Sequence, residues 1–245
     1  MEQTLPRIEY QVSSLSPDAL PVVVVAAGSS SRMGGIDKQF ALIGGVPVLA
    51  KTLMTLEASP LISAIIVVVR EEVRLSVQQL AETYMITKLS DLVVGGSTRQ
   101  ESVANGLSCL PSSVQKVLIH DGARPLIDEP VIDRVVTALK TYPAVACGLP
   151  VTDTIKRLDD EGNVLDTPDR SRLFAVQTPQ GVWLNEYRDA LGKAEDFSSF
   201  TDDLSVMEAA GYPVSTVEGS RRNLKITTPE DLALAEYYIR KEPEE

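Results

Sequence analysis

Short apolar runs alternate with stretches of helical period along most of this chain. The runs are rich in valine and isoleucine and nearly continuous, as is typical of strands that are covered on both faces of a sheet. They predict strands at 22–26, 65–69, 92–94, 117–119 and 144–149. Between them, apolar positions spaced three or four residues apart predict helices over 48–56, over 72–84, after Gly96 and through 132–139. This alternation predicts an α/β fold with a mostly parallel sheet and helices on both faces.

The alternation breaks at Val151. The segment 151–180 is polar, and Asp-Asp-Glu-Gly-Asn at 159–163 has the composition of a turn between two short alternating runs. We therefore predict a β-hairpin arm over 152–172 with little core of its own. Because an isolated hairpin is only marginally stable in water, the arm is expected to pack on another surface, such as a second subunit.

Regular structure is predicted to return near the C-terminus, with a helix over 203–210 and a strand over 214–217. A short strand is then expected to lead into a last helix. Thr228 is its predicted N-cap, Pro229 its first residue, and Asp231 lies three residues after the cap. The chain is thus predicted to consist of an N-terminal tail, 1–20, and a single domain, 21–240, that carries the arm.

The net charge narrows the classes of partner. A formal charge of -11 argues against general binding to nucleic acids or to anionic membranes. With 44% hydrophobic and 23% charged residues, the composition is that of an ordinary globular protein. No apolar run approaches the roughly 20 residues that span a bilayer, and residues 1–20 match neither a signal peptide nor a transit peptide. Two cysteines outside any metal-ligand spacing favour a reducing, cytosolic setting.

Candidate chemistry appears in the loop after the first predicted strand, AAGSSSRMGG, and in the lysine that follows it. Small residues there let backbone N–H groups approach phosphate oxygens closely, and Arg32 and Lys38 add positive charge. The loop is no dinucleotide fingerprint, because three serines follow Gly28, and it lacks the Gly-Lys-Ser/Thr of a Walker A loop. The pattern indicates a site for a strongly anionic ligand, with a plain strand-to-helix turn as the alternative.

The chain resembles a known family through several segments. AAGSSSRM with DKQF is similar to the first loop of sugar-phosphate nucleotidyltransferases with the small pyrophosphorylase fold. The later segments follow in the order of 2-C-methyl-D-erythritol 4-phosphate cytidylyltransferases: GGSTRQESVANGL, IHDGARP, VTDTIK, DRSRLFAVQTPQ, TDDLSVMEAAG and NLKITTPEDLALAE. The resemblance covers 21–240. It implies a Rossmann-like nucleotidyltransferase sheet, a homodimer formed through the arm, and transfer of CMP from CTP to methylerythritol phosphate with Mg²⁺ and release of pyrophosphate. A bacterial cytoplasmic enzyme of isoprenoid precursor synthesis is implied, with a processed plastid protein as the alternative.

The resemblance also implies roles for residues on the nucleotide side. Arg32 and Lys38 would neutralise the triphosphate and the charge that develops in the transition state. Cytosine and ribose would be held by the backbone of Ala26, Ala27 and Gly28 together with Gly96, Ser97 and Ser102. For Ser97, a helix N-cap is an alternative that is compatible with this role. Arg99 and Glu101 in the same segment are expected to be surface charges or to act behind the contacting residues.

Asp121 follows the fourth predicted strand, at the same edge of the sheet. The resemblance implies that its carboxylate holds Mg²⁺, which keeps several waters and is shared with substrate phosphates. A turn-forming aspartate before glycine is the alternative. His120 is expected to be structural, and Arg124 is expected to reach the sugar phosphate or its hydroxyls.

On the acceptor side, Arg170 and Lys225 match the pair that orients the methylerythritol phosphate for attack. Thr154, Thr178 and Thr201 match hydroxyl-bearing positions around that substrate. Because Thr154 and Arg170 lie on or beside the arm, the resemblance implies that they act in the site of the partner subunit. For Arg170, a surface charge cluster is the alternative.

The chain departs from the family pattern at two positions. Ser30 stands where the family often has glycine, and Asp37 replaces a proline and places an anion beside Lys38.

The nearest alternative function is cytidylyl transfer to another polyol phosphate, such as ribitol 5-phosphate. A molybdopterin-type nucleotidyltransferase would leave the arm unexplained. A non-catalytic nucleotide sensor would be expected to lack at least one of Arg32, Lys38 and Asp121.

Overall fold

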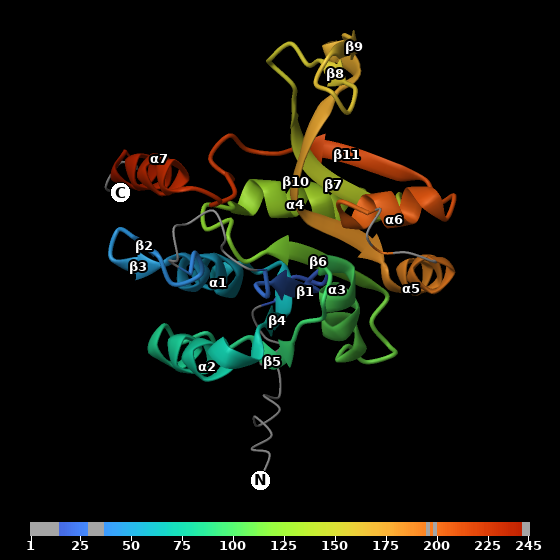
Figure 1. Ribbon diagram of the computed structural model, residues 1–245. Coiled ribbons are helices and arrows are strands. Elements are labelled where there is room, and N and C mark those ends of the chain that lie inside the picture. Colours follow the sequence, from blue (N-terminus) through green and yellow to red (C-terminus); the bar gives the residue numbers. More distant parts are fainter. Residues whose placement is uncertain (1–14, 29–36, 195–196, 198–199, 242–245) are drawn as a thin grey trace.

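One mixed sheet forms the centre of the molecule (Figure 1). The computed structural model describes residues 15–28, 37–194, 197 and 200–241. The sheet has seven strands in the order β11-β7-β10-β6-β1-β4-β5, and β10 runs antiparallel to both of its neighbours while the other pairs are parallel. The five predicted strands are confirmed as β1 (Leu20–Val25), β4 (Ile62–Val69), β5 (Leu89–Val94), β6 (Lys116–Asp121) and β7 (Ala144–Pro150). The sheet is completed by β10 (Phe174–Trp183) and β11 (Val214–Glu218).

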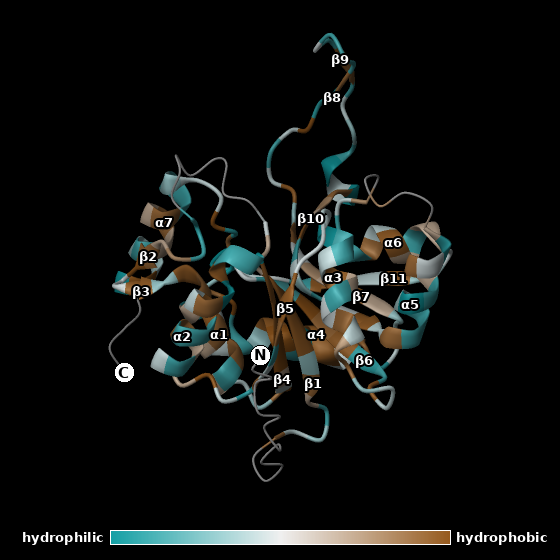
Figure 2. Ribbon diagram, turned by 60° about the horizontal axis from the view of Figure 1, so that its bottom comes forward, coloured by the Kyte–Doolittle hydropathy of each residue, from teal (hydrophilic) through white to brown (hydrophobic). Residues whose placement is uncertain are grey.

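Helices cover both faces of this sheet, as predicted. One face carries α1 (Val48–Ala58), α2 (Arg74–Thr83) with the short η3 (Glu71–Val73) before it, and α4 (Glu129–Ala138). The other carries α3 (Arg99–Ser108), α5 (Leu184–Lys193) and α6 (Asp203–Ala209). The central strands are correspondingly hydrophobic (Figure 2). Along β1, Val22 and Val24 enter the first core and Val23 the second, so both sides of the strand are apolar. In the described part of the chain, no helix has the length and apolar character needed to cross a bilayer.

The C-terminal half differs from the prediction in three places. The polar segment 151–180, for which only a hairpin was predicted, leads into β10, a ten-residue strand of the main sheet. Its polar residues and Pro179, which cannot donate to a ladder, obscure the strand, and its register on β7 shifts between Val176 and Gln180. The helix α5 was not predicted. The short strand expected before Thr228 is wrong, because there the N–H of Ile226 bonds the carbonyl of Ala123 at 2.8 Å instead of joining a sheet.

A third, smaller core anchors the last helix, α7 (Pro229–Arg240). It packs on the hairpin of β2 (Leu42–Ile43) and β3 (Val46–Pro47). The predicted helix start is confirmed: Thr228 is the N-cap, and the Asp231 carboxylate accepts the N–H groups of Thr227 and Thr228 at 2.8 and 2.9 Å. Because Ile226 belongs to this core, the segment before α7 lies beside the end of β6, which places Lys225 there.

The predicted arm projects from the sheet as a two-stranded hairpin of β8 (Arg157–Leu158) and β9 (Val164–Asp166) (Figure 1). Gly162 in its turn has a φ of +88°, which favours glycine, and the Asp159 carboxylate accepts the N–H of Asn163 at 2.8 Å. A short η4 (Arg170–Arg172) leads from the arm to β10. Leu158, Val164 and Leu165 are more than half exposed, so the hairpin has no core within this chain.

Replacing either of two helical glycines by alanine should change the free energy of unfolding, in opposite directions. A Cβ atom on Gly106 in α3 would lie 2.6 Å from Val23 Cγ1 and 2.9 Å from Val68 Cγ2, both in central strands that cannot move away. We expect Gly106→Ala to lower the free energy of unfolding by about 1–3 kcal/mol. Gly192 in α5 has open space there, so Gly192→Ala should raise it by up to about 1 kcal/mol. Urea denaturation of both variants checks this, and equal effects would show that α3 does not pack as closely as described.

Candidate active site

Four loops meet at the carboxyl ends of β1, β4, β5 and β6. Val25, the last residue of β1, pairs with Asp121, the last residue of β6, and the N–H of Gly122 bonds the Val25 carbonyl at 2.9 Å. Likewise, Val69 pairs with Val94, and the N–H of Gly95 bonds the Val69 carbonyl at 2.8 Å. Ligands of open α/β sheets bind at this edge.

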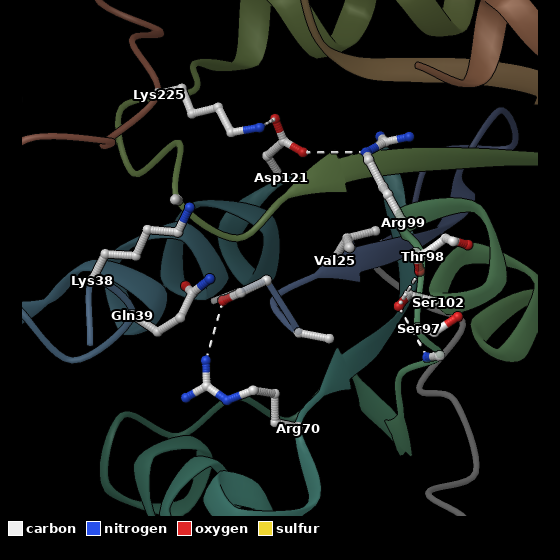
Figure 3. A pocket seen from close by; sticks show the side chains of 14 residues that line it. Val25, Lys38, Gln39, Arg70, Ser97, Thr98, Arg99, Ser102, Asp121 and Lys225 are labelled. Carbon is white, nitrogen blue, oxygen red and sulfur yellow. Dashed lines mark hydrogen bonds and ion pairs between the residues drawn. The ribbon is translucent and has the colours of Figure 1, made fainter. Parts of the chain in front are cut away.

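A cleft of about 420 Å³ opens between these loops (Figure 3). Polar and charged side chains line much of it. Lys38 and Lys225 reach toward the same part of the cleft from segments far apart in the sequence, and Arg99 extends beside Asp121 (Figure 3). Its lining residues are Val25, Ala27, Gly28, Lys38, Gln39, Arg70, Gly96, Ser97, Thr98, Arg99, Ser102, Asp121, Ala123 and Lys225.

The loop before α3 is held in a single shape by its own side chains. Thr98 caps α3, and the Glu101 carboxylate accepts the backbone N–H and the hydroxyl of Ser97 at 2.7 and 2.6 Å. The Ser102 hydroxyl accepts the N–H of Gly96 at 3.1 Å and donates to the Thr98 carbonyl at 2.9 Å. Glu101, expected to be a surface charge or to act behind the contacting residues, organises the loop from behind.

Glycine is required where this loop meets the first one. A Cβ on Gly95 would lie 2.5 Å from the Cβ of Ala27, and one on Gly96 would lie 2.4 Å from the Cβ of Glu101. The Gly95 contact shows that the two loops approach each other closely beside the cleft, and the Gly96 contact leaves no room for a side chain against α3.

Three cations surround the Asp121 carboxylate. Its Oδ2 lies 2.9 Å from Lys225 Nζ and 3.3 Å from Arg124 Nε, and its Oδ1 lies 3.9 Å from Arg99 Nε. Burial alone would raise the pKa of Asp121, but the charges of Lys225, Arg99 and Arg124 hold that pKa well below its ordinary value. The carboxylate is therefore ionised throughout the physiological pH range.

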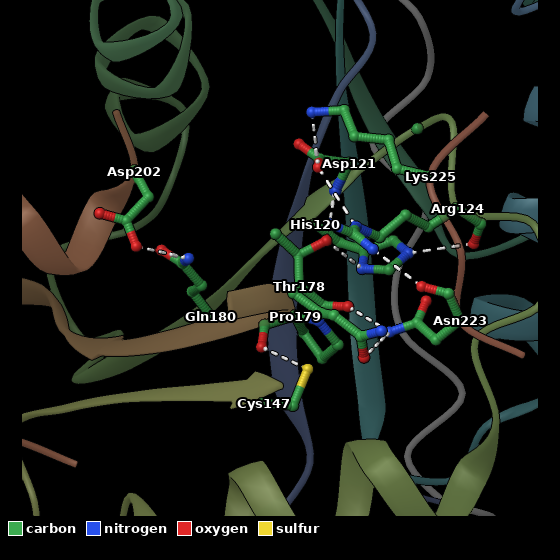
Figure 4. A network of polar contacts seen from close by, with 12 residues as sticks. His120, Asp121, Arg124, Cys147, Thr178, Pro179, Gln180, Asp202, Asn223 and Lys225 are labelled. Carbon is green, nitrogen blue, oxygen red and sulfur yellow. Dashed lines mark hydrogen bonds and ion pairs between the residues drawn. The ribbon is translucent and has the colours of Figure 1, made fainter. Parts of the chain in front are cut away.

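A buried network behind Asp121 fixes its position (Figure 4). The Thr178 hydroxyl accepts the N–H of Asp121 at 3.0 Å and contacts His120 Nδ1 at 3.0 Å. The side-chain amide of Asn223 donates to the Thr178 backbone carbonyl at 2.8 Å, and the Asn223 backbone carbonyl accepts from Arg124 Nη1 at 2.8 Å. Burial lowers the pKa of His120 to about 4, so the imidazole is neutral and structural, as expected from its place at the strand end.

The sequence-predicted nucleotide-side residues lie together, as far as they are described. Ala27, Gly28, Lys38, Gly96, Ser97 and Ser102 line the cleft with Asp121 and Lys225, while Ala26 is buried next to it. Arg32 and Ser30 lie outside the described residues.

The acceptor-side residues are more scattered within one chain. Thr178 and Arg124 are buried behind Asp121. Thr201 is exposed just before the N-cap of α6, and Thr154 and Arg170 are exposed beside the arm, where Arg170 donates to the Thr152 carbonyl at 2.8 Å.

Sequence reasoning did not find the partner of one arginine and missed another arginine altogether. Arg99, expected at the surface or behind the contacting residues, lines the cleft, and its Nη2 lies 2.6 Å from Oδ2 of the buried Asp203. Only the adjacency of α3 and α6 on one face of the sheet reveals this pair. Arg70 follows β4 directly, which was the available signal for it. It lies 2.6 Å from Asp37 and donates to the Gly28 carbonyl at 3.1 Å, so the anion beside Lys38 is compensated.

Comparisons with known proteins agree on one family. The family model described as IspD: 2-C-methyl-D-erythritol 4-phosphate cytidylyltransferase matches residues 20–241. A curated relative with that name from Halalkalibacterium halodurans is 47% identical over 88% of this chain and 94% of its own length. One from Syntrophus aciditrophicus is 41% identical over 90% of this chain and 95% of its own.

Solved structures give the same result. The 4-diphosphocytidyl-2C-methyl-D-erythritol synthase of Anaerococcus prevotii is similar with a TM-score of 0.80 and 30% identity, covering 91% of this chain and 96% of that one. The 2-C-methyl-D-erythritol 4-phosphate cytidylyltransferase of Thermus thermophilus has a TM-score of 0.73 and 32% identity, covering 91% and 99%.

Proposed function

We propose how the cleft works from one premise: this chain belongs to the 2-C-methyl-D-erythritol 4-phosphate cytidylyltransferase family. It is a nucleotidyltransferase that transfers CMP from CTP to 2-C-methyl-D-erythritol 4-phosphate in the non-mevalonate isoprenoid pathway. We assign this reaction to the cleft of Figure 3. The observation that carries the assignment is the convergence of Lys38, Lys225 and Asp121, from three separate segments, on one opening.

The reaction needs charge neutralisation more than proton transfer. An oxygen of the acceptor phosphate forms a bond with the α-phosphorus of CTP, and the bond from that phosphorus to the β-bridging oxygen breaks, so that pyrophosphate leaves with the electron pair. Since the second pKa of a phosphate monoester is about 6, the nucleophile is already ionised at pH 7. No general base is needed, which agrees with the buried, neutral state of His120.

The two glycine-containing loops are the proposed nucleotide site. Backbone groups of Ala27 and Gly28 on one side and of Gly96 and Ser97 on the other line the cleft at the end where the loops nearly touch. A narrow gap edged by backbone donors and acceptors suits a pyrimidine better than a purine. Lys38, at the open side, is placed to bind the triphosphate.

Mg²⁺ is proposed to bind at Asp121. The residues fit this ion, because Asp121 presents one ionised carboxylate to the cleft and Mg²⁺ commonly takes one or two carboxylates and completes its shell with water and phosphate oxygens. A site made by protein ligands alone is not supported, since the described residues contain no group of three or more metal-binding side chains. When bound, Mg²⁺ supplies positive charge to the phosphate oxygens. The position of Asp121 itself is set by Thr178 and the pairing of β6 with β1.

The acceptor phosphate is proposed to bind at Lys225, on the side of the cleft opposite the nucleotide loops. Arg124 and Asn223 hold the segment that carries Lys225, because Arg124 donates to the Asn223 carbonyl two residues before it. Thr201, which is exposed just before the N-cap of α6, is proposed to contact the acceptor. Arg124 and Thr178 act from behind Asp121, as positioning residues.

Arg170 and Thr154 are proposed to act in the site of a partner subunit. Both are exposed beside an arm whose apolar side chains have no core in this chain, and a hairpin of this size is marginal alone. A homodimer that packs the arms on each other would cover Leu158, Val164 and Leu165 and bring Arg170 to the neighbouring cleft. A bacterial cytoplasmic location fits the bacterial source of the relatives named above.

Ser102→Ala tests the nucleotide site. Its hydroxyl accepts the N–H of Gly96 and donates to the Thr98 carbonyl. Losing such bonds costs roughly 1–1.5 kcal/mol, so we expect KM for CTP to rise about tenfold with KM for methylerythritol phosphate unchanged. Ser108→Ala, at the exposed end of the same helix, is the matched control. Steady-state pyrophosphate release measures both. An unchanged KM for CTP in Ser102→Ala would move the nucleotide to another place.

A further inference from the structure

The two oxygens of Asp121 have different surroundings. Oδ2 is engaged by Lys225 at 2.9 Å and by Arg124 at 3.3 Å. Oδ1 faces Arg99, whose Nε is 3.9 Å away, too far for a hydrogen bond. Arginine and carboxylate side chains at this range frequently form a bidentate pair, which Arg99 and Asp121 do not.

Asp203 is what holds Arg99 back. Its Oδ2 lies 2.6 Å from Arg99 Nη2, its Oδ1 accepts the Tyr187 hydroxyl at 2.7 Å, and its N–H donates to Gln180 Oε1 at 2.9 Å. The Asp203 and Tyr187 side chains are fully buried. Asp203 is therefore fixed from three directions and cannot follow Arg99 toward the cleft.

The position of Arg99 has two consequences for a divalent cation. Since Arg99 does not occupy Oδ1, this oxygen can coordinate a metal. The fixed positive charge of Arg99 nevertheless lies beside Oδ1, and Lys225 and Arg124 lie beside Oδ2. The three positive charges therefore already exceed the single negative charge of the carboxylate. A metal ion alone meets repulsion here, and the charge of the nucleotide phosphates cancels it.

We propose that Arg99 and Asp203 are positioning residues for the metal carboxylate, which keep Oδ1 open and make cation binding depend on the nucleotide. This inference rests on the proposed role of Asp121 in holding Mg²⁺. It assigns to Asp203 the role of holding Arg99 in place. Asp203 is fully buried and does not line the cleft, so it acts only through Arg99.

The test is the affinity of the nucleotide-free protein for Mn²⁺ alone, measured from the electron paramagnetic resonance signal of the free ion. Arg99→Gln removes the repelling charge and should tighten Mn²⁺ binding about tenfold. Asp203→Asn keeps that charge but weakens the tether, so that Arg99 can move onto Oδ1; Mn²⁺ binding should weaken several-fold. Arg188→Gln, at an exposed arginine that donates to the Leu107 carbonyl and does not line the cleft, should change nothing.

Opposite shifts in the two variants are the required result, because loss of structure alone would weaken binding in both. If Arg99→Gln does not fold, as judged by circular dichroism, Arg99→Met keeps the apolar stem and must show the same tightening. Asp121→Asn separates this inference from its premise. If it leaves Mn²⁺ binding unchanged, the metal site itself is wrong. If it abolishes binding while Arg99→Gln fails to tighten it, only the positioning role is overturned.

Discussion

Lys38→Ala is expected to lower kcat by about 10²–10³-fold, the usual cost of losing one preorganised charge at a developing anion. The side chain lines the same cleft as the metal carboxylate and is half-buried there, so solvent does not replace it easily. Its effect should fall on kcat more than on KM, because the charge on the transferring phosphate changes most in the transition state. Thermal denaturation should show nearly unchanged stability.

The matched control is Lys140→Ala. Lys140 follows α4 at the other edge of the sheet and pairs with Asp18 at 2.6 Å on the surface, where ion pairs contribute little. Its turnover should equal that of the unmodified protein. If Lys38→Ala turned over at a comparable rate, Lys38 would have no part in the chemistry and Arg32 would be left to carry the charge on this side.

The second large effect is a recovery of turnover, expected when two impaired variants are mixed. Arg170→Ala should reduce turnover by ~10²-fold, because the acceptor would lose one of its orienting contacts. If Arg170 completes the partner's cleft, a mixed dimer of Arg170→Ala and Lys38→Ala subunits has one site with both residues intact. About half of the dimers in an equal mixture are mixed, so roughly a quarter of full activity should return.

The expected recovery of activity follows from the position of Arg170 within its own subunit. Arg170 lies beside an arm with exposed leucine and valine side chains and does not line the cleft of its own subunit. Recovery should appear only after subunit exchange, which gel filtration of differently tagged chains can follow. Activity that stays at the level of the separate variants would mean that Arg170 serves its own subunit or none.

Local pattern was sufficient for much of the fold. Valine and isoleucine runs predicted the parallel strands because both faces of the sheet are covered, and Thr228, Pro229 and Asp231 predicted the start of α7 because capping involves neighbours in the chain. It failed for β10, where Thr178, Pro179 and Gln180 are polar or lack an N–H although the strand is central. There Thr178 bonds the N–H of Asp121, and Gln180 bonds Asp202 and Asp203, so the polar residues of this strand serve tertiary contacts.

The candidate site divides in the same way. The glycine and serine loop, its nearby cations and an aspartate at a strand end could be recognised in order along the chain, because each is a short segment at the end of a predicted strand. The pairing of Arg99 with Asp203 could not, since the two are 104 residues apart and meet only because α3 and α6 cover one face of the sheet. The three-cation environment of Asp121 and the compensation of Asp37 by Arg70 are likewise products of strand order. The spacing of apolar residues determines which face of each helix or strand is buried, but the distance between two charged side chains is set by how the helices and strands pack.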